Sequence, residues 1–323
     1  MSLPSAPAAV TIIVPGFEVE EYAGEALDSL RAQTREDWVA ILVDDASTDG
    51  TSRIFADAAA SDPRFRLVRH VRQQGLGAAR NTGLDLVETP LVGFLDADDM
   101  LTPTALERLV GTLDETGSDF ALGAYVRLRP DGDGGYTTGI VQPWVAAATD
   151  PERRATTIDQ HPAASANIVA WSKVSRIDFW RRTGLRFPVG RLYEDQVVAQ
   201  RMYATARAFD VVPDVVAHWR ERADGSSITQ RKDAVAVLQD YLDGMAGGIA
   251  ELDRAGHAAA VQQRVHLILA MDLPPLVRIA EEHPDDAYRR ALGVFTRDIW
   301  ARGGASAALD EESSALAAAA RLW

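Results

Sequence analysis

The stretch PLVGFLDADDMLTP, residues 90–103, joins an apolar run to a group of carboxylates. Residues 91–95 have the composition of a strand that is covered on both faces of a sheet. Asp96, Asp98 and Asp99 follow at once, and Thr102 and Pro103 then suit the N-cap and first position of a helix. Ligands of open α/β sheets bind beyond the carboxyl ends of the strands, so this stretch predicts a ligand site as well as a strand.

Working outward, the same alternation of strand and helix fills the first part of the chain. The periodicity predicts strands over 10–14, 39–43, 65–69 and 91–95, and helices over 19–33, 51–62, 76–87 and 104–116. Apolar strands joined by helices predict an α/β fold with a mainly parallel sheet flanked by helices. From about residue 229 the chain is rich in Ala and Leu at helical spacing, which predicts a helical C-terminal extension over 229–323.

Composition excludes several classes of function. The 323 residues carry a formal net charge of −14, which argues against nonspecific binding of nucleic acid. The absence of Cys excludes disulfides, thiolate catalysis and zinc bound by cysteine. No signal peptide and no apolar stretch of about 18 residues is evident. We therefore expect a cytoplasmic protein, and a position at the inner face of the cell membrane is compatible with this expectation.

A second acidic group, DDASTDG at 44–50, follows the second predicted strand. It resembles the start of an EF-hand loop, but Ala56 stands where the bidentate Glu of such a loop is required. Turn formation and helix capping account for Ser47, Thr48 and Asp49. They do not account for two carboxylates directly at the end of a strand. The nearby GLGAARNTG, residues 75–83, lacks the third glycine of a dinucleotide-binding turn and follows the third strand rather than the first.

The carboxylates of the D-x-D pair at 96–98 repel one another unless a cation lies among them. Mg²⁺ and Mn²⁺ take one or two protein carboxylates together with substrate phosphates and water. The alternative is that these aspartates are solvated loop residues at the start of a helix and bind no ligand. We expect a site for Mn²⁺ or Mg²⁺ and a diphosphate at this strand end.

Taken together, five segments resemble family 2 glycosyltransferases of the GT-A fold. They are TIIVPGFEVEEYAGEALDSLRAQT, ILVDDASTDGT, GLGAARNTGL, PLVGFLDADDMLTP and GLRFPVGRLYEDQVVAQRM, in the family's order across about 10–230, and HWRERADGSSIT adds a later match. The resemblance implies a GT-A domain over 1–228, with a nucleotide-binding half over about 1–118 and an acceptor half over about 119–228. It also implies metal-dependent, inverting transfer from a nucleotide-diphosphate sugar, with UDP as the usual nucleotide.

The resemblance assigns roles to individual residues. The residues expected to bind the nucleotide-sugar are Pro15, Phe17, Glu18, Asp44, Asp45, Arg80, Asp96, Ala97, Asp98, Arg220 and Arg222. Within this set Asp45 would accept from the base and Asp98 would be the direct metal ligand, with Asp96 and His218 as further candidates for metal. Instead of binding the donor, Arg220 and Arg222 could form salt bridges with neighbouring acidic residues. Instead of binding a metal, His218 could be a partly buried side chain at the end of a strand.

Asp195 in the motif YED resembles the general base, which takes the proton of the acceptor hydroxyl as its oxygen attacks the sugar. Glu194 is the rival for this role. Phe17-Glu18 replaces the family's usual Tyr-Asn, which bears on the identity of the base or sugar more than on the reaction class. The acceptor is expected to be a glycan, glycolipid or polyol phosphate of the cell envelope, and the C-terminal helices are expected to pack or to form a homo-oligomer.

Two other functions are open to such a sequence. One is a non-catalytic module that binds a nucleotide-sugar or a glycan, against which the retained acids at 96, 98 and 195 argue. The other is a nucleotidyltransferase, which shares carboxylates at strand ends, but VPGFEVEEY at 14–22 lacks the glycine-rich signature expected after its first strand.

Overall fold

The computed structural model describes residues 8–223 and 232–323, and its residues cluster into two compact units. The first unit comprises Met1–Thr157, Val169–Arg191 and Ala206–Ala223, and the second comprises Ile158–Ile168, Leu192–Thr205 and Asp224–Trp323. The chain therefore passes between the units several times. The predicted boundary at residues 228 and 229 lies outside the described residues and remains a prediction.

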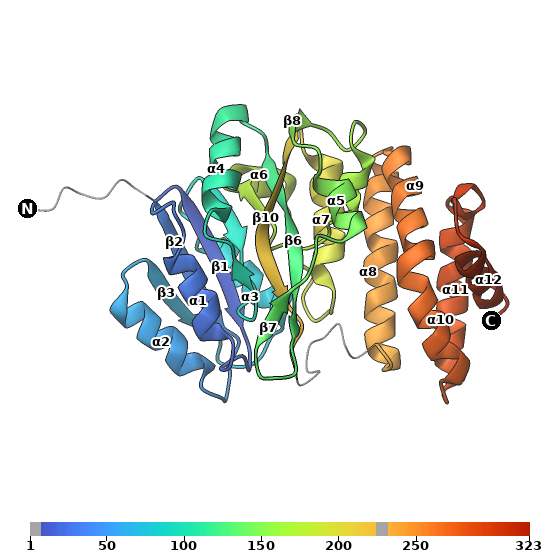
Figure 1. Cartoon of the computed structure of the whole chain (residues 1–323), viewed down its shortest axis with the longest axis horizontal. Coiled ribbons are helices and arrows are strands. Elements are labelled where there is room, and N and C mark those ends of the chain that lie inside the picture. The colour runs from blue at the N-terminus through green and yellow to red at the C-terminus, as the bar shows by residue number, and fades with distance from the viewer. Residues whose placement is uncertain (1–7, 224–231) are drawn as a thin grey trace, which may run out of the picture. The chain divides into compact units, whose positions relative to one another are not determined.

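The first unit is an α/β sheet with helices against it (Figure 1). Its strands are β1 (Val10–Gly16), β2 (Trp38–Asp44), β3 (Phe65–Arg69), β4 (Leu91–Phe94), β5 (Met100–Leu101), β6 (Phe120–Pro130), β7 (Tyr136–Thr138), β8 (Arg153–Thr156), β9 (Lys173–Arg176) and β10 (Phe209–Arg220). Its helices are α1 (Ala23–Arg31), α2 (Thr51–Ser61), α3 (Leu76–Asp85), α4 (Ala105–Thr116), α5 (Pro143–Thr149) and α6 (Ile177–Thr183).

The strand order is β3-β2-β1-β4-β9-β6-β10-β5, with β7 paired to β6 and β8 to β10. The run β3-β2-β1-β4 is parallel, as is the pair of β6 and β10, whereas β5, β7, β8 and β9 pair antiparallel. The predicted α/β class with a helical C-terminal extension is confirmed. The sheet is mixed because short strands such as β9 run against their neighbours. A four-residue strand with a single apolar residue, as in β9, gives no sequence signal of strand direction.

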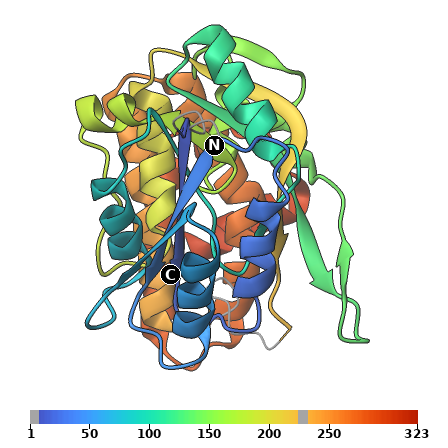
Figure 2. The same ribbon diagram turned by 90° about the vertical axis from the view of Figure 1, so that its left-hand side faces the viewer.

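Helices cover both faces of this sheet, which Figure 2 shows from the side. Ile12 and Val14 of β1 belong to a core shared with α1, α2 and α4. The intervening Ile13 meets α3 on the opposite face, where a Cβ on Gly83 would lie 2.4 Å from Ile13 Cγ2. This alternation holds the carboxyl ends of β1, β2 and β4 at one edge of the sheet, where their loops carry the acidic residues.

The second unit is helical. It contains η1 (Pro162–Ala166), α7 (Glu194–Thr205), α8 (Val235–Arg254), α9 (Ala258–Leu267), η3 (Ile268–Asp272), α10 (Leu273–Glu282), α11 (Asp286–Ala301), η4 (Gly304–Ser306) and α12 (Glu311–Ala320). Helix α8 packs closely on α7 because Gly248 has no side chain, and a Cβ there would come within 2.9 Å of Gln200 Cγ. In the described residues no helix is both long and apolar enough to cross a membrane.

Candidate functional site

The three carboxylates after β4 lie in a tight turn whose backbone is fixed. Leu95 N–H donates to the Ile13 carbonyl at 3.0 Å, and Asp99 N–H donates to the Asp96 carbonyl at 2.9 Å. Asp99 is only 2% exposed. Burial raises the pKa of Asp98, with Asp96 adding to the rise, and burial followed by Asp98 and Asp96 raises the pKa of Asp99 well above its usual range. The fold thus holds negative charge in a place that disfavours it.

Two arginines from distant parts of the chain hold this acidic turn. Arg80 on α3, which is 1% exposed, donates from Nη2 to Asp96 Oδ1 at 2.6 Å. Arg222 donates from Nε to Asp98 Oδ2 at 2.9 Å, and its Nη2 lies 2.8 Å from the same oxygen. Ala97, between the two aspartates, packs its methyl group in the core. The predicted residues 80, 96, 98 and 222 are therefore brought together, with guanidinium groups as the cations.

Arg220 at the end of β10 is a third cation beside the acidic turn, and it is buried. Its Nε donates to the Asp98 carbonyl at 2.9 Å, and its backbone N–H donates to Asp99 Oδ1 at 2.8 Å. Its Nη2 pairs with Glu25 on α1, and its guanidinium lies 4.5 Å from the centre of the Tyr136 ring. At 3% exposure Arg220 supports the acidic turn, and its salt-bridge partner is Glu25, which sequence spacing did not indicate.

The carboxylates of Asp44 and Asp45 lie at the end of strand β2. Asp44 accepts from Ser47 N–H at 2.9 Å and lies 3.1 Å from Arg69 Nε. Asp45 accepts from His70 Nδ1 at 2.6 Å and from the backbone N–H groups of Gln74 and Gly75, the shortest at 2.7 Å. The carboxylate of Asp45 therefore ties strand β2 to the N-terminus of α3. Sequence reasoning missed His70, whose only signal was a lone His just after the third strand.

The β1–α1 turn supplies the remaining nucleotide-binding candidates. Pro15 is buried in β1, whereas Phe17 is 37% exposed. Glu18 has a φ of 51° and accepts from Thr48 N–H at 2.7 Å, which closes the first turn onto the second. The replacement of the family's usual Tyr-Asn by Phe17-Glu18 thus fixes the loop that follows Asp44 and Asp45, because Glu18 accepts from Thr48 in that loop.

His218 lies on β10 opposite Met100 of β5, so the sheet brings it near the acidic turn. Burial, with Arg220 adding to it, lowers the pKa of His218 and favours the neutral ring, which is the form that binds metal. Within residues 8–223 and 232–323 no group of three or more His, Asp or Glu side chains forms a ready metal cluster. A cation at this edge would need oxygen ligands from elsewhere.

The candidate base belongs to the second unit, at the start of α7. Glu194 is 3% exposed and Asp195 is half-buried. Leu192 N–H donates to Asp240 Oδ2 at 3.0 Å, and the Tyr193 ring lies 4.5 Å from the Tyr241 ring, so helix α8 fixes this helix start. Burial, with Asp195 adding to it, raises the pKa of Tyr193 to about 12. Tyr193 also has a φ of 56°, a backbone strain of the kind that gathers at functional sites.

Residues 11–184 match the family model for glycosyl transferase family 2. The chain belongs to glycosyltransferase family 2. Its fold is the GT-A fold.

Two relatives among the curated proteins are about equally similar. Over 196 residues the chain is 30% identical to the glycosyltransferase GlyA of Streptococcus pneumoniae, an alignment that covers 60% of this chain and 28% of GlyA. Over 227 residues it is 30% identical to EpsH of Bacillus subtilis, which covers 69% of this chain and 63% of EpsH. The chain thus spans less than two thirds of the length of either relative.

Among solved structures, TarS of Staphylococcus aureus, residues 1–349 in complex with UDP-GlcNAc, superimposes with a TM-score of 0.71. The match covers 97% of this chain and 87% of that one at 20% sequence identity. A likeness at this identity establishes the shared fold.

Proposed function

We propose that this glycosyltransferase moves a sugar from a UDP-sugar to a hydroxyl group with inversion at the anomeric carbon. The acceptor we propose is a glycan, glycolipid or polyol phosphate of the cell envelope, reached at the inner face of the membrane. The observation that carries the proposal is the turn at 96–99, where buried carboxylates and two arginines converge beyond the carboxyl end of β4. The complex of TarS with UDP-GlcNAc supports the choice of UDP.

The acidic turn fits a divalent cation on physical grounds. Burial raises the pKa of Asp98 and Asp99, so the folded chain holds these groups where added positive charge would be favourable. We propose Asp98 as the direct ligand of Mn²⁺ or Mg²⁺, with Asp96 and His218 as secondary candidates, and with phosphate oxygens of the donor completing the set. When bound, the cation would neutralise charge on the departing diphosphate.

The chain's own groups would hold the rest of the donor. We propose that Phe17 and Pro15 line the nucleotide pocket, that Asp44 and Asp45 serve the ribose and base, and that Arg80 and Arg222 face the phosphates. Arg222 supports this role because its pairing with Asp98 keeps a planar, permanently charged donor at the acidic turn.

We propose Asp195 as the general base, with Glu194 as the rival. Asp195 is the better candidate because it is half-buried, whereas Glu194 is 3% exposed, and a base must reach a proton on the acceptor. Asp195 would accept the hydroxyl proton while the acceptor oxygen bonds to the anomeric carbon and the diphosphate leaves with the electron pair.

The test uses the full chain with a panel of nucleotide-sugars. Thermal stabilisation by UDP-sugars should increase with Mn²⁺ in the natural protein and lose this increase in Asp98→Asn. Asp195→Asn should keep donor binding and lose transfer. Full activity of Asp195→Asn would show that the base is assigned wrongly. Binding without turnover of any donor would favour the alternative, a non-catalytic nucleotide-sugar or glycan-binding module.

A further inference from the structure

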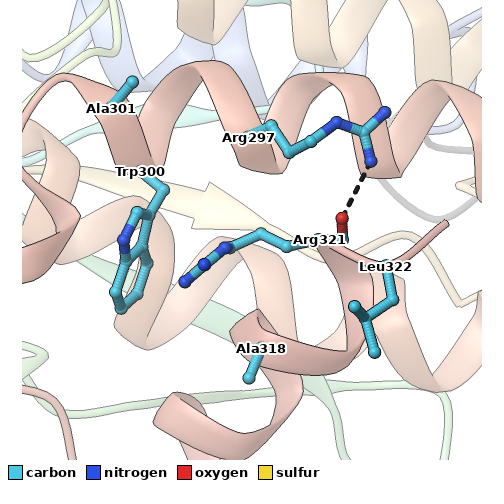
Figure 3. A pocket seen from close by; sticks show the side chains of 6 residues that line it. All are labelled: Arg297, Trp300, Ala301, Ala318, Arg321 and Leu322. Atoms are coloured by element: carbon cyan, nitrogen blue, oxygen red, sulfur yellow. Dashed lines mark hydrogen bonds between the residues drawn. The ribbon is translucent and has the colours of Figure 1, made fainter.

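The second unit contains a hollow between α11 and the end of α12, shown in Figure 3. Its volume is about 510 Å³, and its lining residues are Arg297, Trp300, Ala301, Ala318, Arg321 and Leu322. This size lies within the range of small-molecule sites, about 300–1,000 Å³. None of these residues belongs to the glycosyltransferase machinery described above.

Close backbone packing builds the walls of this hollow. A Cβ on Gly293 would lie 2.5 Å from the Trp323 carbonyl oxygen, so α11 meets the segment after α12 directly. A Cβ on Gly304 would lie 2.6 Å from Trp300 Cδ2, so the indole ring also has backbone against it. Neither glycine can carry a side chain without displacing these groups, so α11 packs closely against the segments on either side of the hollow.

Two cations line the hollow on a chain that is acidic overall. The chain has 47 acidic and 33 basic residues, yet in the described part of it neither Arg297 nor Arg321 lies within ion-pair distance of an aspartate or glutamate. Arg297 Nη1 donates to the Arg321 carbonyl at 2.9 Å and to the Trp323 carbonyl. The Arg321 guanidinium lies 4.4 Å from the centre of the Trp300 ring. The aromatic ring holds this cation in place without neutralising it.

We propose that this hollow binds the phosphate group of a soluble phosphoester, a binding site separate from the donor site. Arginine suits phosphate because its planar guanidinium donates two parallel hydrogen bonds and keeps its charge. Arg321 supplies most of the affinity, since Arg297 already donates to two carbonyl groups. The concave shape favours a soluble ligand over a membrane surface, although Leu322 at the rim is 87% exposed. The inference stands whatever acceptor the enzyme uses.

The experiment measures fluorescence anisotropy of a labelled glycerol phosphate oligomer with the full chain. The natural protein should bind the oligomer, and Arg321→Gln should bind it about tenfold more weakly, because one charge-assisted contact is lost. Ala318→Glu, a change at an exposed position of α12, should abolish binding by placing a carboxylate in the hollow. Arg290→Gln removes the same charge from an exposed site on α11 outside the lining and should leave binding unchanged.

Three results would overturn the inference. The first is no binding of the oligomer to the natural protein, and the second is equal binding by the natural protein and Arg321→Gln. The third is binding only to vesicles of phosphatidylglycerol, which would make the hollow part of a membrane contact. Matching thermal unfolding of the variants and the natural protein keeps these results separate from a loss of folding.

Discussion

Arg220→Met tests whether the buried guanidinium supports the acidic turn. Methionine fills much of the same apolar space and cannot donate, so the change removes the Nε contact to the Asp98 carbonyl and the pairing with Glu25. The Arg220 backbone N–H can still donate to Asp99. Glu25 is largely exposed and can be solvated, but Asp99 then stays buried without the charge of Arg220 near it. A hydrogen bond from a charged donor contributes about 1.5–3 kcal/mol, and we expect a loss of that size at pH 8.

The cost of this change should depend on pH. The pKa of Asp99 is already raised by burial and by its acidic neighbours, and Arg220 acts in the opposite direction, so its removal raises that pKa further. An acid with a raised pKa in the folded state contributes stability below its unfolded pKa, and the contribution disappears as pH rises through the folded pKa. The variant should therefore lose least in acid, where Asp98 and Asp99 are protonated, and most at neutral and higher pH.

Urea unfolding of the full chain, followed by circular dichroism in acid and at about pH 8, measures both effects. Arg154→Met is the control, since Arg154 pairs with Glu115 and Glu152 at a side-chain exposure of 38%, and exposed pairs contribute about 0–1 kcal/mol. A loss below about 1 kcal/mol for Arg220→Met, or a loss of the same size at both pH values, would refute the reasoning.

The remaining predictions concern single positions in the first unit. Ala46 has a φ of 64°, so Ala46→Gly should relieve strain and raise the unfolding free energy by up to about 1 kcal/mol, seen as a higher melting temperature. Gly83→Ala would press a methyl against Ile13 and should lower stability by about 1–3 kcal/mol, whereas Gly111→Ala, with open space around it, should not. His70→Ala leaves Asp45 without its side-chain donor and should cost about 1–3 kcal/mol in urea unfolding, with weaker UDP binding by calorimetry. Unchanged UDP binding in His70→Ala would separate Asp45 from the nucleotide.

Local patterns in the sequence were enough for the fold class and for the position of the acidic turn. Strand and helix alternate in the first 118 residues because apolar spacing reflects which faces are covered, and that spacing is a property of neighbouring residues. The placement of Asp96, Asp98 and Asp99 at a strand end also follows from local order. So does the helical character of the segment after residue 232, where α8 to α12 occur.

Tertiary structure alone decided which groups meet. Arg220 and Glu25 are 195 positions apart, and only the strand order and register bring β10 beside the loop after β4 and near α1. Strand order also makes His70 the partner of Asp45. The packing of the chain, and not its local sequence, places residues 192–205 in the helical unit. Pairing between distant residues depends on how the helices and strands pack and on which side chains this packing buries. The sequence pattern of one segment contains neither kind of information.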